Sequence, residues 1–99
     1  MNMQGTLSLH TVLQQRPGNI TSDMDGEKVM LNVQNGKYYN LGEVGGDIWA
    51  TMAEPVPVSR IIEVIRDHFE VPAETAEQDV FEFIQHLLDE DLAAICSGS

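Results

Sequence analysis

The sequence has few basic residues: five Lys and Arg stand against sixteen Asp and Glu, which gives a formal net charge of −11. No Lys or Arg follows Arg66. Phosphate backbones bind proteins through Lys and Arg that displace counterions, so nucleic acid is a poor partner for this chain. Anionic membrane surfaces are disfavoured on the same grounds. A peptide or protein that carries basic residues would instead be attracted.

Cysteine and long apolar runs are equally scarce. Cys96 is the only cysteine, so no disulfide can form within the chain, which fits a reducing cytoplasm. The sequence contains no run of 18 apolar residues, and no basic N-terminal segment leads into an apolar core. We therefore expect a cytoplasmic protein with no membrane partner.

The residue groupings that catalysis and metal binding require are also missing. Cys96 stands near the end of the chain with no histidine beside it to activate its thiol. His10, His68 and His86 fall in three different predicted elements and lack the spacing of metal ligands. Residues 43–46 lack the Lys and Ser/Thr of a phosphate loop. We expect no enzyme, no metal and no cofactor, which leaves binding.

What the sequence does contain, between residues 20 and 41, is the pattern of an antiparallel meander. The central strand, 28–33, alternates polar residues and methionine with an apolar set, which is typical of a strand with one buried face. The apolar set is Val29, Leu31 and Val33. Asp25-Gly26 and Asn35-Gly36 are two-residue hairpin signals on either side of it. They join it to predicted strands at 20–24 and 37–41, and residues 6–13 are a further strand candidate.

The apolar period changes from 2 to about 3.6 near Gly42, which predicts three helices. The first spans 43–53, and its paired glycines, 45 and 46, indicate a close approach to the sheet at a cost of about 1 kcal/mol each. The second runs from Ser59, as N-cap, to about residue 68. The third has about 17 residues after Val71-Pro72. The acidic run at 89–91 is interpreted as a solvated helix end, and 92–95 as a short strand or a packed segment.

Strands followed by helices predict an α+β fold, with a three-stranded antiparallel sheet and then three helices. The second and third helices are typical of a helix-turn-helix, with the hairpin as its wing, so the fold class is a winged helix-turn-helix. The length of 99 residues predicts a single domain over 1–99, with its core at 7–95.

Two surfaces of this predicted fold are suited to binding. The strand at 37–41 is the last before the helices, so it is expected at a sheet edge where a peptide can add as a further strand. The third helix presents an exposed polar face with Gln78, Asp79, Glu82 and His86 at helical spacing. The plain alternative is that Tyr38, Tyr39 and Phe83 are ordinary core or boundary aromatics.

An ordered set of short motifs resembles the PqqD-like family, the RiPP recognition elements or peptide modification chaperones. The set is Asp25-Gly26, Val29-x-Leu31-Asn32, the run from Asn35 to Leu41, Gly46-x-Ile48-Trp49, and Asp79-Val80-x-x-Phe83-Ile84-x-x-Leu87. The resemblance covers about Leu7 to Ile95 and is strongest to the stand-alone leader-binding proteins of lasso-peptide biosynthesis. One departure is Asn40-Leu41-Gly42, where the family more often has Leu-Asn, so the first helix lacks an expected Asn cap.

The resemblance implies a protein without catalysis that binds the leader of a ribosomal precursor peptide. The leader adds as an antiparallel strand beside the third strand of the sheet and packs against the third helix. Partners implied are the leader, a leader-cleaving cysteine protease and an ATP-dependent macrocyclase. The leader-binding residues carried over by position are Val33, Lys37, Tyr38, Tyr39, Asn40, Leu41, Asp79, Val80, Glu82, Phe83, His86 and Leu87.

Three alternatives stay open from the sequence. The first is a PqqD-type chaperone for another modifying enzyme of ribosomal peptides. The second is a DNA-binding regulator, which the winged fold allows but which a third helix without Lys or Arg disfavours. The third is an adaptor or dimerisation module that uses the same edge strand, against our expectation of a monomer.

Overall fold

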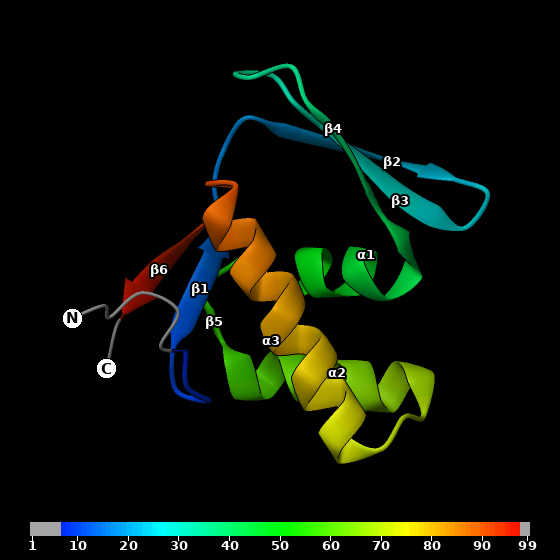
Figure 1. The fold of residues 1–99 in the computed structure, drawn as a ribbon, viewed down its shortest axis with the longest axis vertical. Helices are drawn as coiled ribbons and strands as arrows, with labels where there is room; N and C mark the ends of the chain where they lie inside the picture. Colours follow the sequence, from blue (N-terminus) through cyan, green and yellow to red (C-terminus); the bar gives the residue numbers. More distant parts are fainter. Residues whose placement is uncertain (1–6, 98–99) are drawn as a thin grey trace.

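Two small sheets and three helices make up residues 7–97, the part of the chain that a computed structural model describes (Figure 1). In chain order the elements are β1 (Val12–Gln15), β2 (Asn19–Met24), β3 (Glu27–Asn32), β4 (Tyr38–Leu41), α1 (Gly42–Thr51), β5 (Val56–Pro57), α2 (Val58–Phe69), α3 (Ala73–Asp89) and β6 (Ala93–Ser97). The α+β class that the sequence predicted is confirmed. Its description as a winged helix-turn-helix stays a prediction.

The meander is present as predicted, with the strand order β2-β3-β4 and antiparallel pairing throughout. Asp25 and Gly26 join β2 to β3 and have φ angles of 57° and 86°. Positive φ at both central residues is the conformation of the two-residue turn that favours Asp-Gly. The turn that the sequence predicted at Asp25-Gly26 is therefore confirmed.

The turn between β3 and β4 is longer than the two-residue Asn35-Gly36 turn that the sequence predicted. The main-chain N–H of Asn32 donates to the carbonyl of Lys37 (3.0 Å), so four residues separate the closing pair. The Asn32 side-chain oxygen accepts bonds from the N–H groups of Gln34 (3.0 Å) and Asn35 (2.9 Å). Such local side-chain bonding stabilises a tight turn within the loop, and Gly36 supplies the positive φ of 75° at its end.

The buried face of β3 is the reverse of the one that its alternation suggested. Met30 and Asn32 are the buried residues, at 1% and 6% exposure. A Cβ at Gly46 of α1 would lie 2.8 Å from the Cβ of Lys28, so α1 packs on the Lys28–Met30–Asn32 side and needs glycine there. The apolar set, Val29, Leu31 and Val33, lies half-buried or exposed on the other side.

A second sheet, with the order β5-β1-β6, was not predicted as such. The first strand was expected over 6–13, of which residue 6 lies outside the described residues, but β1 begins at Val12. Before it, the Thr11 N–H donates to the Ser8 carbonyl (3.2 Å) and the Ser8 N–H donates to the Thr11 hydroxyl (3.1 Å), which folds this segment into a turn. β6 confirms the option of a short strand at 92–95, and both partners of β1 come from distant parts of the chain.

The three predicted helices are present, and α3 has the expected 17 residues. Ser59 is not the N-cap of α2, because the helix already begins at Val58 and Pro57 precedes it. The free N–H groups at this helix start are satisfied by carbonyls before β1: Val58 donates to Thr11 (3.0 Å) and Ser59 to Leu9 (3.1 Å). Main-chain bonding to a distant segment thus replaces the side-chain cap that the sequence suggested.

The core lies where the helices meet the inner sides of the two sheets. Its largest fully buried side chains are Leu13, Met30, Ile48, Met52, Ile61, Ile65, Ile84, Leu87, Leu92, Val58 and Val80. The helices lie on one side of the meander in Figure 1. Within residues 7–97, no helix is both long enough and apolar enough to cross a bilayer.

Candidate functional site

β4 forms an open edge of the meander. Among the described strands it pairs with β3 alone. The bond from Asn32 N to Lys37 O fixes which residues of the pair exchange hydrogen bonds. Since bonded and non-bonded residues alternate along an antiparallel pair, Tyr39 bonds to β3, whereas the N–H and C=O groups of Tyr38 and Asn40 point to the open edge.

The strand that precedes the meander in the chain, β1, does not cover this edge. β1 pairs with β5 and β6 and takes no part in the meander. The C-terminal strand β6 likewise joins β1 rather than β4. The edge that the sequence predicted is therefore not occupied by residues 7–13 or by the described part of the C-terminal segment.

A cleft of about 380 Å³ lies between α1 and α3. Its lining is apolar along α1 and mixed along α3: Val44, Gly45 and Ile48 come from α1, and Asp79, Glu82, Phe83 and His86 from α3. A Cβ at Gly45 would lie 2.7 Å from the Cε1 atom of Phe83, so glycine is what lets the ring lie against α1. The cleft thus has an apolar floor and two carboxylates along its α3 wall.

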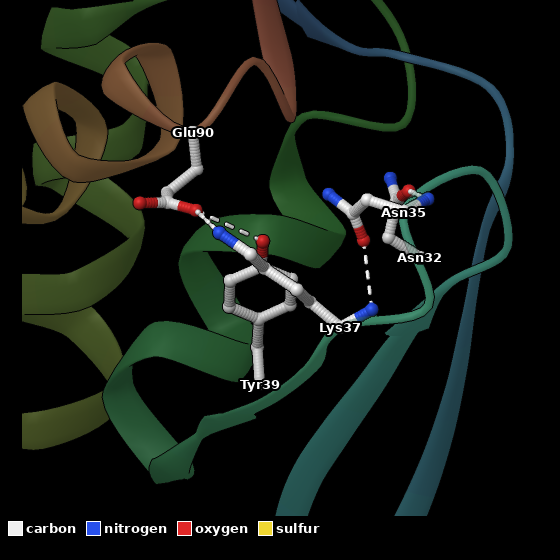
Figure 2. Close-up of polar contacts among 5 residues, drawn as sticks. All are labelled: Asn32, Asn35, Lys37, Tyr39 and Glu90. Carbon is white, nitrogen blue, oxygen red and sulfur yellow. Dashed lines mark hydrogen bonds and ion pairs between the residues drawn. The ribbon is translucent and has the colours of Figure 1, made fainter.

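A polar contact joins β4 to the end of α3 at one end of this region (Figure 2). The Tyr39 hydroxyl donates to Glu90 Oε1 (3.0 Å), and Lys37 Nζ lies 3.4 Å from the same oxygen. The Tyr39 bond, and then the Lys37 charge, lower the pKa of the Glu90 carboxyl below its ordinary value of 4.5. This contact fixes the position of β4 relative to α3.

The structure brings most of the predicted site residues to this region. On β4, Tyr38 is 68% exposed and points away from the helices, while Tyr39 and Leu41 are half-buried on the helix side. Asn40 is exposed, and its side-chain oxygen accepts a bond from the Gly42 N–H (3.0 Å), so it supports the start of α1 after all. Val33 is 54% exposed in the β3–β4 turn.

Along α3 the predicted residues divide into two groups. Asp79, Glu82, Phe83 and His86 line the cleft. Val80 and Leu87, by contrast, are 0% exposed and belong to the core, so their side chains are not available to a ligand in this structure. Both were carried over by position from the family motif, and in the structure they lie on the inner side of α3.

Sequence reasoning missed the α1 wall and Glu90. Val44 and Ile48 fall within the helix predicted over 43–53 but were not singled out, although Gly45 between them indicated a close approach. Glu90 was interpreted as part of a solvated acidic helix end, yet its side chain is 30% exposed and bonded to β4. Nothing local in the sequence signals that contact, because 51 residues separate Tyr39 from Glu90.

The described residues hold no grouping of three or more His, Cys, Asp or Glu side chains that could bind a metal ion. The features present are instead an open strand edge and a partly apolar cleft beside a helix. An open strand edge of this kind is a feature to which an extended peptide can add as a further strand.

The chain belongs to the PqqD family: the family model for coenzyme PQQ synthesis protein D (PqqD) matches residues 27–93. That range runs from the start of β3 to the start of β6 and includes β4, α1 and α3. The family resemblance that the motifs indicated is thereby confirmed. No curated protein matches the sequence.

Three solved structures are similar to this one. TbiB1 in complex with the TbiA(beta) leader peptide is 28% identical, with a TM-score of 0.71 over 81% of this chain and 93% of that one. A lasso peptide synthetase B1 complexed with the leader peptide is 20% identical, with a TM-score of 0.70 over 83% and 96%. The PqqD truncation of Methylobacterium extorquens PqqCD, a stand-alone RiPP recognition element, is 15% identical, with a TM-score of 0.74 over 93% and 99%.

The contact between Tyr39 and Glu90 predicts a pH-dependent contribution to stability. Replacing Tyr39 by Phe should lower the melting temperature at about pH 7, because the bond to the ionised carboxylate is lost. A carboxyl whose pKa is lowered in the folded state stabilises the fold at a pH above its pKa in the unfolded state. That stabilisation is lost as the pH falls through the pKa of the folded state. The difference in melting temperature between variant and wild type should therefore become smaller below pH 4.5, as measured by thermal unfolding at several pH values. Tyr38→Phe, on the exposed side of the same strand, is the control, and a pH-independent difference would contradict the assignment.

Proposed function

We propose that this protein binds the N-terminal leader of a ribosomally synthesised precursor peptide as an added strand beside β4. The observation that carries the proposal is the open edge, where the N–H and C=O groups of Tyr38 and Asn40 point away from β3. An extended peptide completes such an edge with main-chain hydrogen bonds. Similarity to two proteins solved with leader peptides supports this choice of ligand.

The surroundings of the edge determine which leader residues fit. An added strand places alternate side chains on opposite faces of the sheet. Those on the helix side are directed to the cleft between α1 and α3, where Val44, Ile48 and Phe83 accept an apolar side chain. Asp79 and Glu82 line the same cleft, so a leader with a Lys or Arg near that apolar residue is favoured. The net charge of −11 attracts the same kind of peptide over longer distances.

In this function the protein performs no chemistry itself and presents the bound precursor to processing enzymes in the cytoplasm. The enzymes implied by the resemblance to lasso-peptide systems are a leader-cleaving cysteine protease and an ATP-dependent macrocyclase. Binding through the leader suits that role, because it leaves the part of the precursor that is modified free of the β4 edge.

Replacing Asn40 by Pro tests the strand addition directly. Proline removes the N–H that points to the open edge, so leader affinity measured by isothermal titration should fall about tenfold or more. Asn40→Ala keeps this N–H and loses only the side chain, and it should stay within about threefold of wild type. Both variants need circular dichroism to show that they fold. Unchanged binding by folded Asn40→Pro would refute strand addition at β4. Tyr39→Pro is a poorer test, because the Tyr39 N–H already bonds to β3.

The acidic wall is tested by neutralising Asp79 and Glu82 together. The double variant Asp79→Asn, Glu82→Gln should bind a leader with basic residues about threefold or more weakly at low salt, and its affinity should depend less on salt. The matched control is Glu74→Gln, Glu77→Gln, which removes the same charge from α3 outside the cleft. An equal loss in both double variants would mean that net charge, rather than the cleft, attracts the leader.

A further inference from the structure

The exposed apolar side chains of this protein gather on the meander. The large hydrophobic residues with high exposure among those described are Leu9, Ile20, Met24, Val33, Tyr38 and Ile95. Four of these six lie on β2, on β4 or in the β3–β4 turn, and none lies on a helix. A concentration of this kind marks an interaction surface, whereas singly scattered apolar residues do not.

Most apolar side chains of β2 and β3 lie on the face of the meander that points away from the core. An antiparallel sheet with one solvated face normally turns its apolar residues inward and its polar residues outward. In β2 the polar residues Thr21 and Asp23 share the face of Met30 and Lys28, which is the helix side. Ile20, Ser22 and Met24 point the other way, as do Val29 and Leu31 of β3. The apolar set of two strands therefore faces away from the core.

These side chains form one connected surface, which we term the outer face: Ile20, Met24, Val29, Leu31 and Tyr38. Ile20 lies opposite Leu31, and Leu31 lies opposite Tyr38, so a row of apolar side chains crosses all three strands. Directly opposed side chains in an antiparallel sheet are close enough to touch. None of the described helices covers this row, because α1 packs on the Lys28 side of the sheet.

We propose that the outer face is the docking surface for the protease that removes the leader, a partner with an apolar patch bordered by basic residues. This inference rests on the proposed leader binding. The apolar row matches the patch, and the acidic residues Asp25 and Glu27 at the β2–β3 end of the face match its basic border.

The outer face is continuous with the edge where the leader adds. Tyr38 belongs to the outer face through its side chain and to the open edge through its main chain. A strand added to β4 extends the sheet, so every second leader side chain lies on the outer face beside Tyr38. A partner on this face contacts protein and leader together, and it therefore binds the loaded form more tightly than the empty one.

The net charge of the chain disfavours two other partners for the outer face, a second copy of the chain and an anionic membrane. A second copy of the chain brings another net charge of −11, which opposes self-association through this surface. An anionic membrane is repelled by the same charge and by the acidic end of the face. A basic-bordered protein is the partner that both the apolar row and the charge favour.

The test uses the purified leader-cleaving protease encoded beside the precursor gene, titrated into the protein with its leader bound. The double variant Ile20→Thr, Met24→Gln removes apolar side chains that are 57% and 56% exposed, so folding should be unaffected. Leader affinity should stay within about twofold of wild type, while protease affinity and the rate of leader removal should each fall about tenfold or more. The matched control is Leu9→Gln, Ile95→Thr, which removes exposed apolar side chains away from the meander and should leave both unchanged.

Each outcome has a separate meaning. If wild type binds no leader, the proposed function fails. If wild type binds leader but the Ile20/Met24 variant recruits the protease and supports leader removal as wild type does, the outer face is not the docking surface. Light scattering on the wild type covers the remaining case: a dimer that the same variant dissociates would make this face a self-interface and overturn the proposal.

Discussion

The central physical feature of this structure is the edge of β4, whose outward main-chain groups have no strand partner within residues 7–97. A strand edge exposes N–H and C=O groups in a row that another chain can complete, and proteins usually cover, charge or shorten such an edge. Here Tyr38 and Asn40 keep theirs open. In the proposed function the leader occupies this edge as a further strand, and its side chains on the helix side enter the cleft between α1 and α3.

Several features keep this edge available and in place. The strand that precedes the meander, β1, pairs with β5 and β6 in the second sheet and does not cover β4. The Asn32 side chain organises the β3–β4 turn, and Glu90 fixes β4 to the end of α3 through Tyr39 and Lys37. A preorganised edge loses less conformational entropy on binding than a mobile one, so these contacts favour affinity as well as stability.

The elements with local signals could be predicted from the sequence, and those that depend on distant contacts could not. The Asp25-Gly26 turn follows from turn chemistry and the length of α3 from the apolar period, and the β4 edge follows from its place as the last strand before the helices. The second sheet, the α1 wall of the cleft and the Glu90 contact depend on residues far apart in the chain. The buried face of β3 was predicted wrongly because its apolar residues Val29 and Leu31 lie on the outer face, whereas Met30 and Asn32 are buried. Apolar residues on the side of a strand that faces away from the core are the arrangement that the proposed docking surface requires.

Amide hydrogen exchange with and without the leader peptide is the sharpest test of strand addition at β4. We expect the amide protons of Tyr38 and Asn40 to become protected when the leader binds, whereas Tyr39, already bonded to β3, should change little. Leader binding that leaves both Tyr38 and Asn40 exchanging as fast as in the free protein would contradict it.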